Sequence, residues 1–353
     1  MSDSIIVRSS KGEYEVAFVK HAGERLAEFV ADGAQVVCDS KVARVHPDLL
    51  MSTPPDQLVL FEAVETNKTM EKAQWLMQML SERQLRRNQQ VIAIGGGIVQ
   101  DVTAFSASIL YRGIDWVFFP TTLLAQADSC IGGKTSINLA DRMNLVGSFH
   151  PPTQVVVDLD FLDSLSDDDI RSGIGEIMHY YLYADSPYTQ ELVDEQAALL
   201  SDRTKLRPHI EESLTIKRVV IEEDEFDRGE RNKFNYGHTF GHALEATTRF
   251  AINHGQAVTV GMDLANRLSA EHGMLDAGEA ERLHRLLEWN LPSYDWGSLN
   301  IEEYLSALGS DKKNVSSDLT CILSGGPGKL FKHVLPIDEG LRQSIGQYFA
   351  SIS

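Results

Sequence analysis

The sequence predicts an α/β protein in which an N-terminal domain with a Rossmann-like parallel sheet is followed by a mainly α-helical domain. Short runs rich in β-branched and aromatic residues alternate with helical patterns up to about residue 165, as is typical of a parallel sheet covered by helices. The remaining patterns are mainly helical. We therefore expect two domains, 1–165 and 166–353, with a ligand crevice between them, where small molecules commonly bind.

Seven short apolar runs predict the strands of the first domain, and they cover residues 5–8, 14–19, 35–38, 58–62, 91–94, 116–119 and 154–157. Helices are expected between them at residues 68–85 and 98–110. In the second domain, helical patterns predict helices at residues 168–182, 204–222, 235–249, 254–272 and 277–288. Two late strands are expected at residues 319–323 and 330–334.

Composition excludes several classes of protein. The chain has 353 residues and a formal net charge of -19, which argues against a nucleic-acid surface because phosphate neutralisation needs clustered Lys and Arg. Its three cysteines are scattered and form no Cys-x-x-Cys pair, as expected in a reducing compartment. No signal peptide and no apolar run of roughly 18 residues is visible. We expect a cytoplasmic protein with no membrane or nucleic-acid partner.

A glycine turn follows the strand expected at residues 91–94. Gly95, Gly96 and Gly97 let the backbone approach a phosphate closely, although three glycines alone are equally consistent with a mere tight turn. Other polar side chains near strand ends suit the ribose and phosphate of a nucleotide, although each can instead cap a helix. They are Glu65, Lys68, Asp101, Thr121 and Thr122.

Further along the chain, amide, carboxylate and cationic side chains suit a substrate that carries a phosphate and a carboxylate. Any one of them alone is more simply explained as a solvated surface group. Gly132 and Gly133 precede the first lysine of the set, which therefore sits on a flexible or sharply turned backbone. The set comprises Asp128, Lys134, Asn144, Lys217, Arg231, Asn235, His242, Lys312 and Lys313.

Three histidines lie close together in the sequence. His238 and His242 are four residues apart and share one face of a helix, and His254 lies at the expected start of the next helix. Glu176 lies in an apolar helix, where a carboxylate needs a cation or a donor. One glutamate and two histidines with an open position suit a catalytic zinc site. Spacing favours the pair at i and i+4 as ligands but does not settle which two histidines bind.

Together these motifs resemble the 3-dehydroquinate synthase family and, more broadly, the sugar-phosphate cyclases. The motifs at residues 95–101, 112–113, 120–129, 132–134, 144–147 and 237–242 keep the order and spacing of the family. The resemblance implies an NAD- and zinc-dependent lyase, with Co²⁺ as a possible metal. Its reaction would be oxidation, β-elimination of phosphate, re-reduction, ring opening and an intramolecular aldol step.

The resemblance also implies roles for individual residues. Glu176, His238 and His254 would hold the metal, which frees His242 to face the phosphate and transfer protons. NAD would be held by Glu65, Lys68, Gly95, Gly96, Gly97, Asp101, Thr121 and Thr122. Catalysis and substrate binding would fall to Asp128, Lys134, Asn144, His179, Lys217, Asp227, Arg231, Asn235 and one of Lys312 and Lys313. Arg112 would reach a phosphate across the interface of a homodimer.

Three positions depart from the family pattern. His179 replaces a lysine, Met143 replaces another lysine, and Asp227 replaces the catalytic glutamate. These changes favour a second hypothesis, a related cyclase that forms an aminodehydroquinate, a 2-deoxy-scyllo-inosose or a valiolone. A third hypothesis is a metal-dependent polyol or alcohol dehydrogenase of similar two-domain build, which would consume NAD and would not need the phosphate-binding set.

Overall fold

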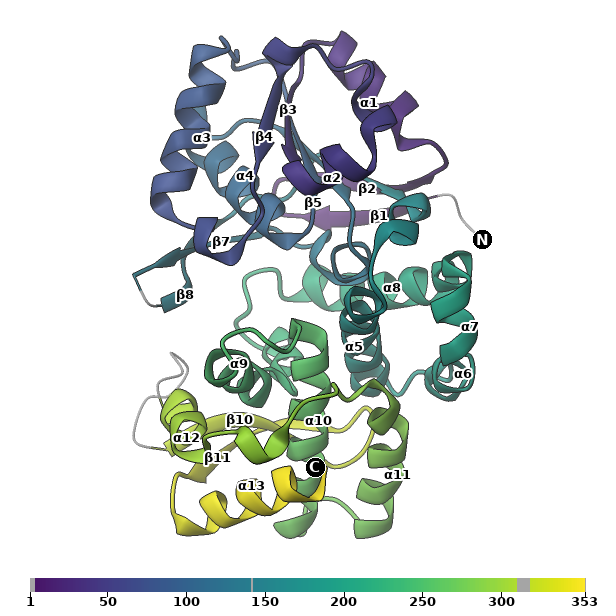
Figure 1. Cartoon of the computed structure of the whole chain (residues 1–353), viewed down its shortest axis with the longest axis vertical. Coiled ribbons are helices and arrows are strands. Elements are labelled where there is room, and N and C mark those ends of the chain that lie inside the picture. Colours follow the sequence, from purple (N-terminus) through teal and green to yellow (C-terminus); the bar gives the residue numbers. More distant parts are fainter. Residues whose placement is uncertain (1–3, 141, 310–317, 353) are drawn as a thin grey trace. The chain divides into compact units, whose positions relative to one another are not determined.

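A computed structural model describes residues 4–140, 142–309 and 318–352 (Figure 1). Packing divides the chain into two compact units. The first unit is Met1–Ser166 with Ile210–Phe226, and the second is Asp167–His209 with Asp227–Ser353. This division differs from the expected boundary at residue 165 mainly in the segment Ile210–Phe226, which follows the first break but packs with the first unit.

The first unit is built on a seven-stranded sheet in the order β1-β2-β9-β6-β5-β3-β4. β1 and β2 pair antiparallel, and the other neighbours pair parallel, so the predicted mostly parallel sheet is confirmed. The strands are β1 (Ser4–Ser9), β2 (Gly12–Val19), β3 (Gln35–Asp39), β4 (Leu58–Phe61), β5 (Val91–Gly95), β6 (Trp116–Pro120) and β9 (Gln154–Asp158).

Helices cover both faces of this sheet. In Figure 1, α3 (Met70–Glu82) and α4 (Gly97–Ile109) lie on one side of the strands, and α1 (Ala22–Ala31) and α2 (Ser40–Val45) lie on the other. The core on the α1 side joins apolar residues of α1 to alternate residues of β3, β5, β6 and β9, because successive side chains of a strand point to opposite faces.

The first unit has three further features. An antiparallel hairpin is formed by β7 (Lys134–Leu139) and β8 (Arg142–Phe149). α8 (Arg207–Glu223) contributes all but its first turn. The remaining short helices are η1 (Pro47–Leu50), η2 (Pro55–Gln57), η3 (Glu65–Asn67), η4 (Leu110–Arg112), η6 (Leu159–Ser164) and the π-helical turn η5 (Ala125–Ser129).

The second unit is a helical assembly around α10 (His254–Glu271). α10 is buried on nearly all sides, as expected of a central helix, and it packs against α5 (Asp167–Ala184) and α9 (His238–Thr247). The outer helices are α6 (Thr189–Asp194), α7 (Gln196–Ser201), α11 (Ala277–Leu287), α12 (Ile301–Gly309) and α13 (Glu339–Ser351).

One small sheet completes the second unit, in which β10 (Asp318–Ser324) pairs antiparallel with β11 (Leu330–Pro336). Its short helices are η7 (Arg203–Leu206), η8 (Glu230–Asn235), η9 (Glu288–Asn290) and η10 (Trp296–Ser298). Among the described residues, no helix has the length and apolar character that crossing a membrane would require.

Candidate active site

The glycine turn lies where two neighbouring parallel strands end. β5 ends at Gly95, and the amide of Thr121, just after β6, donates to the Gly95 carbonyl at 3.0 Å. A Cβ at Gly95 would lie 2.7 Å from Cγ2 of Val99, so a larger residue would push the helix away from the strand. The hydroxyl of Thr122 accepts from the Ala125 amide at 3.2 Å. A strand that turns tightly into a helix N-terminus is suited to binding nucleotide phosphates.

Lys68 contacts two other predicted site residues. Its Nζ lies 2.6 Å from Oδ2 of Asp101 and 2.7 Å from Oδ1 of Asn144. Ser136 donates its amide to Oδ1 of Asp101 at 2.8 Å and its hydroxyl to Oδ2 at 3.1 Å. Burial raises the pKa of Asp101, although Lys68 and Ser136 offset part of the rise. Two residues predicted to bind NAD therefore share a network with Asn144, which was predicted to bind substrate.

Strand β7 carries two polar residues that sequence reasoning missed, Ser136 and Asn138. The side-chain amide of Asn138 donates to Oε1 of Glu65 at 2.7 Å. Lys134, the exposed first residue of β7, precedes them at intervals of two. Residues two apart lie on the same face of a strand. The spacing from Lys134 could therefore have identified Ser136 and Asn138 as residues of the same face.

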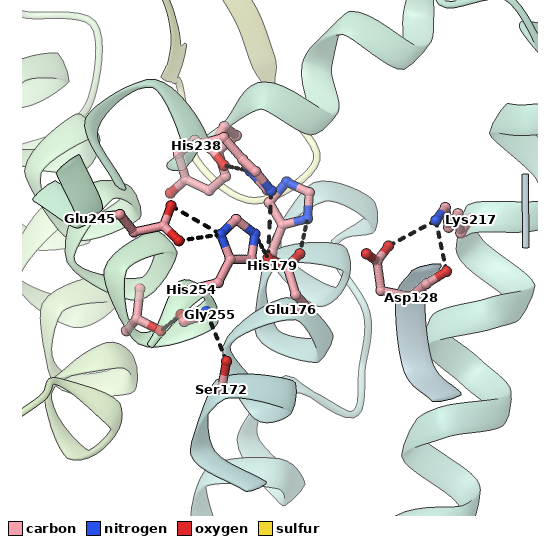
Figure 2. Close-up of polar contacts among 11 residues, drawn as sticks. Asp128, Ser172, Glu176, His179, Lys217, His238, Glu245, His254 and Gly255 are labelled. Carbon is pink, nitrogen blue, oxygen red and sulfur yellow. Dashed lines mark hydrogen bonds and ion pairs between the residues drawn. The ribbon is translucent and has the colours of Figure 1, made fainter. Parts of the chain in front are cut away.

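Asp128 lies in the π-helical turn η5 and holds a lysine of α8 (Figure 2). Nζ of Lys217 lies 2.9 Å from Oδ1 of Asp128 and 2.7 Å from its carbonyl oxygen. The Lys217 side chain is buried and that of Asp128 is partly exposed, so the lysine end of this ion pair is shielded from water. The lysine predicted to lie near a substrate carboxylate is thus held by an aspartate that was predicted to be catalytic.

In the second unit, three helices meet backbone to backbone at glycines. A Cβ at Gly175 would lie 2.0 Å from the carbonyl oxygen of Gly255, and a Cβ at Gly255 would lie 1.7 Å from that of Ser172. A Cβ at Gly237 would lie 2.7 Å from the carbonyl oxygen of Val258. The absence of side chains therefore brings α5, α9 and α10 together. Each of these three glycines adjoins one predicted metal ligand, and the ligands are Glu176, His238 and His254.

Glu176 lies at the centre of the resulting cluster (Figure 2). Its Oε1 lies 3.5 Å from Nε2 of His238 and 3.2 Å from Nε2 of His254. Nδ1 of His238 lies 3.1 Å from the carbonyl oxygen of Tyr236, and Nδ1 of His254 lies 3.1 Å from both carboxylate oxygens of Glu245. Both imidazoles therefore turn Nε2 toward Glu176.

The electrostatics of the cluster favour a positive charge at its centre. Burial works to raise the pKa of Glu176, but the charge and hydrogen bonds of His238 and His254 outweigh it and hold that pKa well below its usual range. Burial likewise works to lower the pKa of His254, but the Glu245 and Glu176 carboxylates raise it well above its usual range.

The donor set fits a divalent metal ion. One ligand atom each from Glu176, His238 and His254 lies within 4.8 Å of the other two. Tetrahedral zinc with bonds of about 2.0–2.1 Å places neighbouring ligand atoms about 3.3 Å apart, close to the observed 3.2 and 3.5 Å. In a second set, ligand atoms of His242, Glu245 and His254 also lie within 4.8 Å of one another. Within the described chain, neither set pairs His238 with His242, the combination that spacing favours.

The histidines beside these ligands lie in different surroundings. The ring of His242 stacks on that of His254, with centroids 5.6 Å apart. The His179 side chain is fully buried, and its Nδ1 lies 3.8 Å from Oε2 of Glu176. Its ring packs against those of Tyr180 and Phe234 at 5.0 and 5.9 Å.

Other predicted site residues lie on connecting segments. Asp227 has a left-handed backbone, with φ of 59°, and its carbonyl accepts from Nδ2 of Asn232 at 3.3 Å. Arg231 is buried in η8, and Asn235 ends that helix. Arg112 is exposed at the end of η4, with φ of 68°. Lys312 and Lys313 lie outside the described residues.

Comparison with solved structures gives the fold. A 2-deoxy-scyllo-inosose synthase solved with carbaglucose-6-phosphate, NAD⁺ and Co²⁺ matches with a TM-score of 0.87 and 22% identity, over 98% of this chain and 99% of that one. The 2-epi-5-epi-valiolone synthase of Streptomyces hygroscopicus subsp. jinggangensis 5008, solved with NAD⁺ and Zn²⁺, matches with a TM-score of 0.82 and 24% identity, over 96% of both chains. The fold is that of the sugar-phosphate cyclases.

Sequence comparison gives the family. Residues 58–172 match the family described as 3-dehydroquinate synthase N-terminal, and residues 173–314 match 3-dehydroquinate synthase C-terminal. The 3-dehydroquinate synthase of Xanthomonas campestris pv. campestris (strain 8004) is 39% identical over 335 residues, 90% of each chain. That of Rhodopseudomonas palustris (strain ATCC BAA-98 / CGA009) is 37% identical over 325 residues, 87% of this chain and 85% of the relative.

The chain therefore belongs to the 3-dehydroquinate synthase family, which confirms the resemblance noted in its motifs. Its activity is that of an NAD- and metal-dependent sugar-phosphate cyclase, a carbon–oxygen lyase of the shikimate pathway.

Proposed function

We propose that the substrate is the seven-carbon 3-deoxy sugar-acid phosphate, which is converted into 3-dehydroquinate and inorganic phosphate. The observation that carries this proposal is 39% identity over 90% of the chain to a 3-dehydroquinate synthase. The inosose and valiolone cyclases are only 22% and 24% identical. Lys217 and Arg231 favour the same acid, because two cations suit a substrate carboxylate.

The metal is proposed to be zinc, held by Glu176, His238 and His254. Support comes from the 3.2 and 3.5 Å spacings of their ligand atoms, and Co²⁺ is the alternative because it accepts the same donors. When bound, the metal supplies Lewis-acid polarisation of a substrate oxygen. His242 is proposed to transfer a proton near the phosphate. Its ring stacks on that of His254, so it lies beside the proposed metal ligands but is not one of them.

NAD is proposed to bind at the carboxyl edge of the parallel sheet. When bound, it takes up and returns a hydride and is therefore not consumed. The glycine turn would receive its phosphates on backbone amides, while the network around Lys68 holds the adjoining carboxylate and amide groups in place. The proposed residues are Glu65, Lys68, Gly95, Gly96, Gly97, Asp101, Thr121 and Thr122.

The substrate is proposed to be held by the charged and amide groups predicted from the sequence. Asp128 fixes Lys217 at 2.9 Å, so that the ammonium group is oriented before substrate arrives. Arg112 is proposed to reach the phosphate of a neighbouring subunit in a homodimer. The other proposed contacts are Lys134, Asn144, His179, Asp227, Arg231, Asn235 and one of Lys312 and Lys313.

A related cyclase with another substrate is the second candidate. It is favoured by His179, Met143 and Asp227, because imidazole and thioether groups replace two flexible ammonium groups and one carboxylate is shorter. The dehydrogenase hypothesis has weaker support. An iron-containing alcohol dehydrogenase matches with a TM-score of 0.61 and 15% identity, which shows a shared fold and nothing more.

One assay separates these candidates. The zinc-loaded protein is incubated with the seven-carbon sugar-acid phosphate and a trace of NAD, and phosphate, cyclic product and NADH are measured. Phosphate release with a cyclic product and no net NADH is expected. Release only from a neutral sugar phosphate would instead assign the related cyclase, and accumulation of NADH would assign the dehydrogenase.

Two histidine variants test the proposed division of roles. His254→Ala should lose both zinc and turnover, whereas His242→Ala should keep zinc and lose turnover. Zinc content is measured by metal analysis of the dialysed proteins. Equal loss of zinc from both variants would contradict the assignment of His254 to the metal and His242 to proton transfer.

A further inference from the structure

His254 is held by carboxylates at both of its ring nitrogens. Nε2 faces Oε1 of Glu176 at 3.2 Å, and Nδ1 faces both oxygens of Glu245 at 3.1 Å each. Glu245 lies on α9, its side chain is buried, and it comes three residues after His242. The second imidazole of the cluster differs, because the partner of Nδ1 of His238 among the described residues is the neutral carbonyl of Tyr236.

We propose that Glu245 is a positioning residue that fixes the tautomer and the ring direction of His254 as a metal ligand. The proposal rests on the proposed role of Glu176, His238 and His254 in holding the metal. A carboxylate only accepts hydrogen bonds, and a neutral imidazole has one donor and one acceptor nitrogen. Carboxylates face both ring nitrogens, but the proposed metal would take the lone pair of Nε2 on the Glu176 side, so Nδ1 carries the hydrogen that Glu245 accepts.

The charge of Glu245 gives it a further effect on the metal. A carboxylate behind a ligating imidazole raises the basicity of the ligand, and such outer partners change metal affinity by about 10–100-fold. A carbonyl oxygen, as used by His238, fixes the ring but brings no full charge. His254 is therefore the more strongly donating of the two imidazoles, and this strength depends on the carboxylate of Glu245 rather than on hydrogen bonding alone.

The variant Glu245→Gln tests this inference because it keeps the shape and one acceptor oxygen but removes the charge. Its amide can also donate, so the tautomer of His254 is no longer enforced. The affinity of the metal-free protein for Zn²⁺ is measured by competition with a chromophoric chelator, together with the visible spectrum of the Co²⁺ form. We expect affinity to fall about 10–100-fold, with a Co²⁺ spectrum that keeps the coordination number of the wild type.

Asp263→Asn is the matched control. Like Glu245, Asp263 is a buried carboxylate, but it lies on α10. It accepts hydrogen bonds from Nδ1 of His284 and from the hydroxyl of Tyr348, each at 2.9 Å. It lies nine residues from His254, about 13 Å along the helix. This variant should lose stability and keep the Zn²⁺ affinity of the wild type. Glu245→Asp, which keeps the charge, should recover part of the affinity and replaces the glutamine variant if that variant does not fold.

Three results would overturn the inference. They are wild-type Zn²⁺ affinity in Glu245→Gln, an equal loss of affinity in Asp263→Asn, and a change of coordination number in the Co²⁺ spectrum of Glu245→Gln, as expected if Glu245 were itself a ligand in the second donor set. A wild-type protein that binds neither Zn²⁺ nor Co²⁺ would instead contradict the proposed function. The two failures are therefore distinguished before any assay of turnover.

Discussion

Replacing Gly255 by alanine should disrupt the metal cluster through the backbone alone. The added Cβ would lie 1.7 Å from the carbonyl oxygen of Ser172 and 2.7 Å from its carbonyl carbon, whereas ordinary contact begins at 3.4 Å. Neither atom belongs to a flexible side chain, so α5 and α10 must move apart by about 1.7 Å at this crossing, the difference between those contacts. The spacing of 3.2 Å between Glu176 and His254 would widen accordingly.

The expected effects are large on metal binding and moderate on stability. Metal sites tolerate changes in ligand distance of about 0.2 Å, so Zn²⁺ affinity should fall by more than ten-fold. Overpacking of this kind costs about 1–3 kcal/mol of the free energy of unfolding. Chelator competition measures the first effect, and denaturant unfolding of the metal-free protein measures the second.

Gly346→Ala provides the control for this prediction. Gly346 lies inside α13, and a Cβ there would meet nothing within 4 Å. Alanine is favoured over glycine in a helix by about 0.5–1 kcal/mol, so this variant should be slightly more stable and should bind Zn²⁺ normally. If Gly255→Ala also kept the affinity and stability of the wild type, the close contact between α5 and α10 would not be what forms the ligand cluster.

Three further predictions concern other parts of the chain. Lys68→Met leaves the Asp101 carboxylate without its cation, so the free energy of unfolding of the first unit should fall by about 3 kcal/mol. NADH should also bind more weakly in a fluorescence titration. An unchanged unfolding midpoint would show that the contact between Lys68 and Asp101 does not stabilise the unit. The hydrogen bond and charge of Asp263 raise the pKa of His284. This pair therefore contributes its full amount to the free energy of unfolding below about pH 6.5, and the contribution is lost as pH rises through the raised pKa. His284→Gln should therefore cost more stability at about pH 6 than at about pH 9, and an equal cost would refute this linkage. Burial raises the pKa of each cysteine thiol to about 12, so a thiol reagent should react only on unfolding, and rapid reaction of the native protein would count against this burial.

The parallel sheet could be predicted because its central strands are buried on both faces. Every residue of β5 and β6 is buried, and such strands read as continuous apolar runs. The β7–β8 hairpin was not predicted, because β8 is exposed along most of its length and carries no apolar pattern. The membership of α8 was also missed, since an amphipathic helix shows which face it buries but not which unit it packs against.

The residues that we propose to hold the metal could be proposed from the sequence, but their geometry could not. His238 and His242 share a helix, as their spacing predicts. His238 is the first residue of that helix, however, and the Tyr236 carbonyl just before it turns Nε2 toward Glu176. Glu245 is a partner of His254 only because α9 and α10 cross at glycines. Spacing within one helix contains no information on such a crossing.

The three departures from the family pattern lie outside the backbone contacts that bring the ligands together. Gly175, Gly237 and Gly255 form those contacts and are all present. His179 fills a fully buried position, and its Nδ1 lies 3.8 Å from Oε2 of Glu176. A lysine side chain at this position would be longer and would carry a positive charge. Because the proposed ligand positions depend on the glycines, we expect the departures to change the affinity for the substrate while the reaction class is kept. His179→Lys should therefore alter KM more than zinc content, which a metal analysis beside the kinetics would measure.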